Sequence, residues 1–184
     1  MHLMIDTETL DVGSFPVLLS IGAVVFNPYE PNKFIDFERI IDPDSCIKLG
    51  ATISFSTIRW WFQQNKEARD KIAYAKNTVS IDNVLNDLTK FIKDNKVKKV
   101  WSHGANFDAV LIDNYYKALN METPYIYYNV RDTRTIFDLT QVSKSRTEPK
   151  VKHNALEDAR AQANDVCRCY IGFQQLMEKN NNNA

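Results

Sequence analysis

"LMIDTETLD", at residues 3–11, joins a short apolar run to three closely spaced acids. The apolar run predicts a buried strand, and Asp6, Glu8 and Asp11 follow it directly. Because residues i and i+2 of a strand point to the same face, Asp6 and Glu8 should converge on one point. Converging buried carboxylates repel each other unless a cation neutralises them, so this stretch predicts half of a divalent-metal site. A strand end that runs into a polar loop would give the same pattern, and Asp11 is expected to be an ordinary loop acid.

Two further strands are expected near the start of the chain. Residues 16–27 contain the apolar run "PVLLSIGAVVF", and residues 33–41 contain the alternating stretch "FIDFERII". The turn-rich "NPYEPN" joins them. With the first strand at residues 2–7, this order predicts an antiparallel meander.

The rest of the chain predicts helices separated by short strands. A helix capped by Ser56 should carry "TIRWWFQQNKEARDKIAYA", and an amphipathic helix should follow at "SIDNVLNDLTKFIKDN". Short strands are expected at "KKVWSH" and "YIYYNV", each followed by a helix, and residues 141–152 predict a mobile loop. The last helix should start near Asn154 and carry an apolar stripe that faces a core. This order predicts a mixed sheet flanked by helices, an α/β or α+β domain.

The composition fits one globular domain. The chain has 184 residues and is 44% hydrophobic, so residues 1–178 are expected to form a single domain and residues 179–184 a disordered Asn-rich tail. Lys+Arg and Asp+Glu both number 23, which gives a formal net charge of zero. A simple basic nucleic-acid coat protein needs a positive surplus, so that class is disfavoured. The zero net charge does not disfavour an enzyme that binds phosphate through metal ions.

Cysteine content and hydropathy bear on the compartment. The spacing of Cys46, Cys167 and Cys169 suits neither a zinc site nor a disulfide framework, which indicates a reducing environment. No segment reaches transmembrane length and no basic, apolar leader is present at the N-terminus. We therefore expect a cytoplasmic protein.

A second acid lies at the junction "VWSHGANFDAVLI". An apolar strand ends there, a turn with glycine follows, and Asp108 falls in the first turn of the next helix. Such an acid can simply complement the helix dipole. Alternatively, the strand-to-helix junction brings Asp108 to the same sheet edge as Asp6.

The segment "HNALEDA" at residues 153–159 is the most informative. Asn154 and Glu157 have the spacing of a helix capping box, with Asn in place of Ser or Thr. His153 then precedes the cap and Asp158 lies in the first turn, so an imidazole and a carboxylate should meet across the helix start. A surface histidine beside a helix-start acid is the alternative.

Together, these segments place four acids and one histidine at element boundaries. Two metal ions held by carboxylates can stabilise both the attacking and the leaving oxygen in phosphodiester cleavage. A neutral imidazole can take the proton from the attacking water. The combination therefore predicts a metal-dependent nuclease, although each motif alone is weak.

"DTET", "NFDAVLI" and "HNALEDA" resemble the three motifs of the DEDDh 3′-5′ exonucleases, the DnaQ-like group with an RNase H-like fold. The resemblance covers residues 4–173. "STIRWW", "GANFD" and "RDTRT" resemble the small phage exodeoxyribonucleases and the mycobacterial-type exoribonuclease domain. The third motif has a histidine at 153 rather than a tyrosine closer to Asp158, and in this it resembles the DEDDh branch and not the DEDDy branch.

The resemblance implies an α/β domain with a mixed five-stranded sheet that begins with three antiparallel strands. It implies a 3′-5′ exonuclease that releases nucleoside 5′-monophosphates from single-stranded DNA or RNA, and a possible homodimer. Asp6, Glu8 and Asp158 would hold one Mg²⁺, Asp6 would bridge to a second, and Asp108 would support the second. His153 would be the general base, and Mn²⁺ would substitute for Mg²⁺.

Candidate substrate-binding residues lie beside these motifs. Phe107 would stack on the terminal base or simply fill the junction before Asp108. Arg131 and Arg134 would support the substrate or be surface charges around a capped helix. Thr7, between the first two acids, completes this set.

Two other features carry weaker predictions. Trp60 and Trp61 would stack on a base or belong to the core, and the core is favoured for at least one of them. The loop before His153 is basic, and its side chains would contact phosphate or be simply solvated. The loop's cations are Lys144, Arg146, Lys150 and Lys152.

Two other functions remain open at the level of sequence. A noncatalytic nucleic-acid-binding module could keep the same fold without turnover. A phosphohydrolase acting on small nucleotides would use the same acids.

Overall fold

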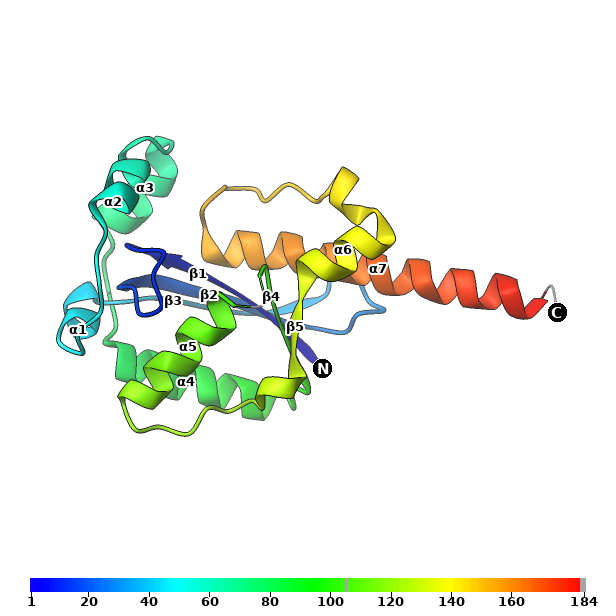
Figure 1. Cartoon of the computed structure of the whole chain (residues 1–184), viewed down its shortest axis with the longest axis horizontal. Coiled ribbons are helices and arrows are strands. Elements are labelled where there is room, and N and C mark those ends of the chain that lie inside the picture. The colour runs from blue at the N-terminus through cyan, green and yellow to red at the C-terminus, as the bar shows by residue number, and fades with distance from the viewer. Residues whose placement is uncertain (105, 183–184) are drawn as a thin grey trace.

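A five-stranded mixed sheet with helices on both faces forms the centre of the molecule (Figure 1). The computed structural model describes residues 1–104 and 106–182. The strand order is β3-β2-β1-β4-β5, in which β1 and β2 pair antiparallel, as do β2 and β3, whereas β4 pairs parallel with β1 and with β5. The predicted meander is therefore confirmed. The strands are β1 (His2–Thr9), β2 (Leu18–Phe26), β3 (Phe34–Ile40), β4 (Lys99–Ser102) and β5 (Val130–Asp132).

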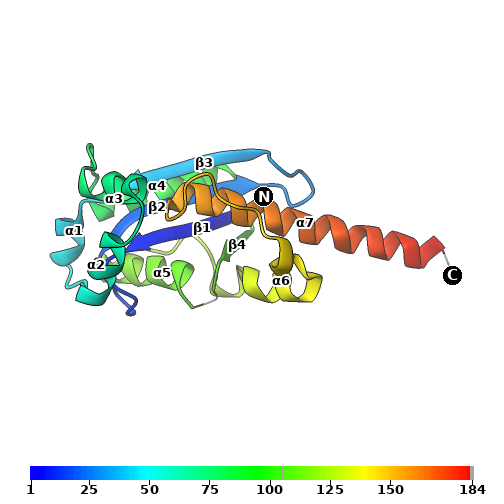
Figure 2. The same cartoon turned by 90° about the horizontal axis from the view of Figure 1, so that it is seen from above.

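Alternation along β1 supplies both layers of the core. Leu3 and Ile5 pack into the cluster beneath α4 and α5, whereas Met4 packs into the cluster beneath α6 and α7. The figures show these two helix pairs on opposite faces of the sheet (Figures 1 and 2). Because Asp6 and Glu8 continue the phase of Met4, they lie on the face that α7 covers. The helices are α1 (Pro43–Ile47), α2 (Phe55–Phe62), α3 (Lys66–Ala73), α4 (Ile81–Asp94), α5 (Asp108–Ala118), α6 (Thr133–Thr140) and α7 (Ala155–Asn182).

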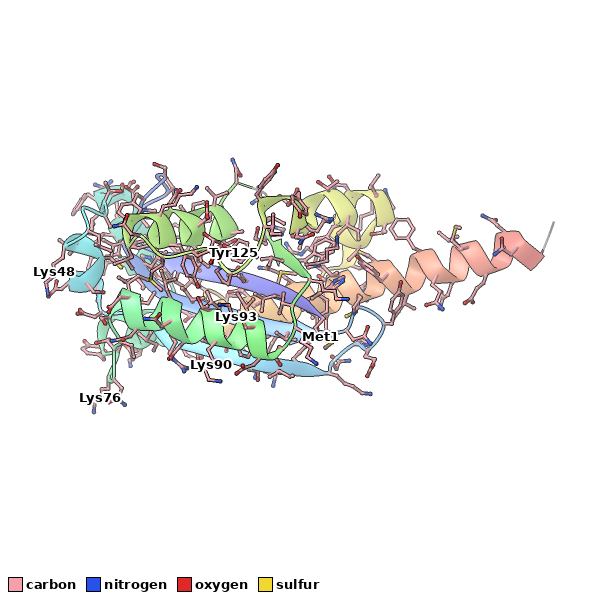
Figure 3. The ribbon with its side chains drawn as sticks, turned by 90° about the horizontal axis from the view of Figure 1, so that it is seen from below. Met1, Lys48, Lys76, Lys90, Lys93 and Tyr125 are labelled. Atoms are coloured by element: carbon pink, nitrogen blue, oxygen red, sulfur yellow. The ribbon has the colours of Figure 1, made fainter. Side chains whose placement is uncertain are left out.

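The amphipathic helix α4 follows its predicted pattern. Its buried residues recur at helical spacing and pack under the sheet, while Lys90 and Lys93 point away from the protein (Figure 3). Burial of this apolar face explains why the segment is helical in this position. The buried residues are Ile81, Val84, Leu85, Leu88 and Ile92.

The long helix expected after Ser56 is two helices, so that prediction is wrong. Ser54, not Ser56, is the N-cap residue of α2, and this helix ends at Phe62. Asn65 then caps α3, its side chain accepting a hydrogen bond from the Ala68 backbone N–H at 2.9 Å. Asparagine at a cap competes with the continuous helix because its side chain satisfies a backbone donor locally.

The stretch "YIYYNV" is not a strand over most of its length. Residues Tyr127–Asn129 form a short 3-10 helix (η1), and β5 begins only at Val130. The tyrosines of η1 are exposed, so the alternating aromatic pattern does not correspond to a half-buried strand here. A second 3-10 helix (η2, Val142–Ser145) lies in the segment expected to be a loop.

Helix α7 is buried only in its first half. Ala159, Ala163 and Val166 pack on the sheet, whereas Phe173 and Met177 are exposed because the helix extends beyond the domain (Figure 2). The prediction that the whole apolar stripe faces a core is therefore wrong. The helix continues to Asn182, contrary to the expectation of disorder from residue 179, because extending an existing helix avoids the cost of nucleation. Residues 183–184 lie outside the described residues.

None of the helices described is both long enough and apolar enough to cross a bilayer. The three cysteines are buried and unpaired.

Candidate active site and metal centre

Three carboxylates converge at the end of β1. Asp6 and Glu8 from β1 and Asp158 from α7 each place one oxygen within 4.8 Å of the others. The strand periodicity brings the first two together, and the start of α7 supplies the third. The structure thus brings together three of the four acids predicted as metal ligands.

A glycine in β2 allows α7 to approach this closely. Gly22 pairs with Asp6 across the β1–β2 ladder. A Cβ atom at Gly22 would lie 2.2 Å from both the Ala155 carbonyl carbon and the Leu156 nitrogen. Only glycine therefore lets the helix backbone rest on the sheet next to Asp6.

The first turn of α7 fixes the orientation of Asp158. The side-chain oxygen of Asn154 accepts hydrogen bonds from the backbone N–H groups of Leu156 and Glu157, both at 3.1 Å, which confirms Asn154 as the cap. The Asn154 N–H in turn donates to Asp158 Oδ2 at 3.0 Å. The expected capping-box partner, Glu157, instead binds Arg160 at 2.5 Å, so the predicted box is wrong in its second half.

Asp108, in the first turn of α5, is nearly fully buried. Its Oδ1 accepts hydrogen bonds from the Thr7 backbone N–H at 3.0 Å and from the Thr7 hydroxyl at 2.8 Å. Asp108 is not part of the three-carboxylate group, but its charge acts on Asp6. The Thr7 hydroxyl, predicted to contact substrate, is therefore used to orient Asp108.

Gln162 is a site residue that the sequence interpretation missed. Its side-chain amide donates to Asp6 Oδ1 at 2.8 Å, and the residue is only 5% exposed. The amide oxygen Oε1 is buried and has no hydrogen-bond partner among the described residues. Gln162 follows Asp158 by four residues, so helical spacing alone would have placed both side chains on one face of the helix.

The electrostatics of the cluster favour a bound cation. Burial, followed by the charges of Asp108, Glu8 and Asp158, raises the pKa of Asp6 well above its ordinary value. Burial likewise raises the pKa of Asp108 to about 6 and raises the pKa of Asp158. Carboxylates that are costly to ionise together, and that offer only hard oxygen atoms, fit divalent ions such as Mg²⁺ or Mn²⁺.

His153 adopts a left-handed backbone conformation, with φ of 59°. Such a conformation is unfavourable for a residue with a side chain and is often kept at functional sites. Its ring packs edge-to-face against Trp60 at 4.7 Å between centroids. Asp158 accepts the Asn154 N–H, and the charge of His153 also lowers the pKa of Asp158 against the larger effect of burial.

An aromatic pocket of about 410 Å³ adjoins the carboxylates. Trp61 is buried and its indole N–H donates to the Thr9 carbonyl at 2.9 Å, so this tryptophan belongs to the core as expected. Trp60 is 39% exposed and lines the pocket together with Phe107. The pocket is therefore open to a planar ligand beside Glu8.

The two arginines of "RDTRT" differ in position. Arg131 donates to the backbone carbonyls of Tyr128 and Val130 at 2.7 and 2.8 Å, so the structure does not bring it to the carboxylates. Arg134 is exposed, and its guanidinium lies over Gly104, close to the start of α5. Asp11 binds the Thr52 hydroxyl at 2.6 Å in the loop after β1, as expected of a loop acid.

Comparisons with known proteins agree with this geometry. A family model described as the 3′-5′ exoribonuclease Rv2179c-like domain matches residues 1–170. An exodeoxyribonuclease of Enterobacteria phage T4 is 24% identical over 189 aligned residues, which cover 84% of this chain and 82% of the phage protein.

Solved structures share the fold. Exonuclease X in complex with 5′-overhanging duplex DNA has a TM-score of 0.57 and 18% identity, with 93% of this chain and 92% of that chain covered. A 3′-exonuclease recognising the 3′ end of a histone mRNA stem-loop has a TM-score of 0.51 and 10% identity, with 95% of this chain and 81% of that chain covered.

Proposed function

The chain belongs to the 3′-5′ exoribonuclease Rv2179c-like family and is a 3′-5′ exonuclease, and from this premise we propose that it degrades single-stranded nucleic acid by a two-metal, DEDDh-type mechanism. Membership of an exonuclease family favours an enzyme over a noncatalytic binding module. The observation that carries the proposal is the convergence of Asp6, Glu8 and Asp158 within 4.8 Å.

The acids would divide between two Mg²⁺ ions, with Mn²⁺ as a substitute. Asp6, Glu8 and Asp158 would hold one ion, Asp6 would also reach the second, and Asp108 would support the second. When bound, the ions stabilise the attacking and leaving oxygens of the phosphodiester. The hydrogen bonds from Thr7 to Asp108 and from Asn154 to Asp158 keep these carboxylates in place before metal arrives.

His153 is the proposed general base. Its imidazole would accept the proton of the attacking water, and the hydroxide would attack the phosphorus of the 3′-terminal phosphodiester. The bond from this phosphorus to the 3′ oxygen of the preceding nucleotide would break, and that oxygen would take up a proton from water. The products are a shortened strand with a 3′ hydroxyl and a nucleoside 5′-monophosphate. The contact with Trp60 and the left-handed backbone at His153 restrict the ring to the rim of the carboxylate cluster. Small displacements of a catalytic group have large effects on rate, so restricting the position of the His153 ring favours catalysis.

The aromatic pocket is the proposed binding site for the 3′-terminal nucleoside. Trp60 and Phe107 line this pocket with aromatic rings, on which a base can stack, and a single base enters such a pocket only when it is released from its pair. This requirement favours a single-stranded 3′ end. The pocket lies beside Glu8, so a stacked base would present its 5′ phosphate to the carboxylates.

The test is digestion of matched single-stranded DNA and RNA, labelled at the 5′ end, with Mg²⁺ or Mn²⁺. We expect shortening from the 3′ end, release of 5′-mononucleotides and complete inhibition by EDTA. The ratio of the two rates gives the sugar preference, for which the family model and the phage relative differ in description. Cleavage of small nucleotides without cleavage of either oligonucleotide would contradict the proposal and support a phosphohydrolase.

A further inference from the structure

Arg146 lies outside the carboxylate cluster, in the segment that precedes His153. Its Nη1 lies 3.2 Å from Nε2 of His103, at the end of β4, and its guanidinium lies over the Phe137 ring at 5.2 Å. A guanidinium can only donate hydrogen bonds, so Nε2 of His103 is the acceptor. The His103 ring therefore carries its proton on Nδ1, which donates to the Thr133 hydroxyl at 2.8 Å.

A buried carboxylate fastens the loop that carries Arg146. Asp165 in α7 is 0% exposed and accepts hydrogen bonds from the Thr147 backbone N–H and hydroxyl, the latter at 2.7 Å. Arg168 also donates to Asp165, at 2.9 Å, and Nε of Arg146 lies 3.6 Å from it. A buried charge is costly unless it is paired, so the hydrogen bonds that Thr147 and Arg168 donate to Asp165 must remain in place. The segment preceding His153 is therefore anchored to α7.

Arg134, in α6, also lies against the segment that follows β4. Its guanidinium carbon lies 3.6 Å from the position that a Cβ on Gly104 would occupy, directly after His103 in the chain. The Arg134 guanidinium has no hydrogen bond or ion pair with any of the residues that the structure describes. The two arginine head groups thus lie against consecutive residues, His103 and Gly104, which precede Asp108 by five and four positions in the chain.

The charges of both arginines act on candidate metal ligands. Among the charges acting on the ligand carboxylates, that of Arg134 lowers the pKa of Asp108 and that of Arg146 lowers the pKa of Asp158, against the larger effect of burial. Burial and the charges of Arg146 and Arg134 lower the pKa of His103 to about 4. His103 is therefore neutral at physiological pH and leaves the positive charge to the arginines.

We propose that Arg134 and Arg146 form a phosphate subsite for the phosphodiester immediately 5′ of the scissile one, an inference that rests on the proposed exonuclease function. Helix α2, which carries Trp60, and helix α6, which carries Arg134, lie well apart in both views (Figures 1 and 2). A strand whose terminal base occupies the aromatic pocket would cross the carboxylates toward the arginines. Guanidinium groups bind phosphate in a bidentate manner, which suits both arginines for contacts with a backbone phosphate.

The first experiment measures kcat/KM of the variants Arg134→Ala and Arg146→Ala on two substrates. One is a single-stranded oligonucleotide, and the other is the p-nitrophenyl ester of thymidine 5′-monophosphate, which has no phosphate 5′ of the scissile one. We expect kcat/KM to fall roughly 10- to 100-fold on the oligonucleotide, the range for a lost charged hydrogen bond, and to be nearly unchanged on the ester. Lys90→Ala is the matched control, because it removes one positive charge from the far side of α4 (Figure 3).

A second substrate isolates the phosphate itself. An oligonucleotide with one uncharged methylphosphonate at the penultimate linkage should lose rate with the wild-type enzyme, and the arginine variants should lose little more on it. Equal losses on oligonucleotide and ester would overturn the proposal, because the arginines would then act on the scissile phosphate. Unchanged kcat/KM on the oligonucleotide would also overturn it. A wild-type enzyme inactive on both substrates would refute the exonuclease mechanism itself.

Discussion

Gln162 donates a 2.8 Å hydrogen bond to Oδ1 of Asp6 from a position one helical turn after Asp158. One helix therefore supplies both a metal-ligand candidate and the group that orients another ligand on the neighbouring strand. The buried Oε1 of the same amide has no partner among the described residues. An unsatisfied buried acceptor costs roughly 1–3 kcal/mol, so the arrangement indicates a functional constraint.

Gln162→Leu should weaken metal binding. Without the amide, Asp6 is free to turn away from its orientation toward the site, and loss of such a partner lowers metal affinity roughly 10- to 100-fold. Isothermal titration of Mn²⁺ into the substrate-free protein measures this directly. Gln174→Leu, which changes an exposed glutamine on the same helix, is the control. Equal Mn²⁺ affinity in the two variants would show that Gln162 does not orient Asp6.

Gly22→Ala should displace the start of α7 from the sheet. The added Cβ would collide with the Ala155 and Leu156 backbone, and overpacking of this kind costs about 1–3 kcal/mol of unfolding free energy. Urea denaturation and nuclease assays should show losses of both stability and activity. Gly172→Ala provides the contrast, because nothing lies within 4 Å of its Cβ position and alanine favours a helix by about 1 kcal/mol. Similar stabilities of the two variants would contradict the close approach at Gly22.

Asp6→Asn should stabilise the metal-free protein, and more so at higher pH. Because the pKa of Asp6 is raised in the folded state, the folded protein keeps a proton that the unfolded chain releases above pH 3.8. The contribution of Asp6 to stability therefore falls as the pH rises from that value toward the raised pKa. The Asn side chain has no such dependence and can still accept the Gln162 hydrogen bond.

Thermal unfolding in EDTA measures this difference. The Tm of Asp6→Asn minus that of the wild type should increase from pH 5 to pH 8. Both proteins contain His2 and His103, whose lowered pKa values also make Tm depend on pH, so these contributions cancel in the difference. Excess Mn²⁺ at pH 8 should reverse the order of the two proteins, because an amide binds the ion weakly. A difference in Tm that does not grow with pH would contradict the raised pKa of Asp6 in the folded, metal-free protein.

Trp60→Ala should lower kcat as well as weaken substrate binding. Its ring packs on His153 at 4.7 Å, so its loss releases the proposed base, and misplacement of a catalytic group costs about 10- to 100-fold in rate. Trp60→Phe, which keeps a ring, should recover part of kcat. Phe62→Ala, an exposed aromatic on the same helix, is the control. An increase in KM with kcat unchanged would assign Trp60 to the substrate alone.

Local patterns in the sequence predicted much of this site. The two-residue period of β1 placed Asp6 and Glu8 on one face, and "HNALEDA" placed Asn154 at the start of a helix. Both inferences depend only on neighbouring residues. The sheet order beyond the first three strands followed from the resemblance rather than from periodicity.

The features that sequence did not reveal depend on residues distant in the chain. Glu157 leaves the capping box because Arg160 joins it to Asp36 in β3, a partner that no local rule identifies. Gln162 acquires its role only because α7 lies on β1. Arg131 and Arg134 look alike in "RDTRT", yet Arg131 donates to the backbone carbonyls of Tyr128 in η1 and Val130 in β5, whereas Arg134 reaches Gly104.

The most direct test of the central claim compares wild type, Asp6→Ala and Asp158→Ala. Shortening of a 5′-labelled single strand is followed together with chromatography of the released 5′-mononucleotides. With Mg²⁺ we expect the wild type to shorten the strand progressively from its 3′ end, and both variants to be inactive while their circular dichroism spectra match that of the wild type. Undiminished activity in either variant would contradict the account.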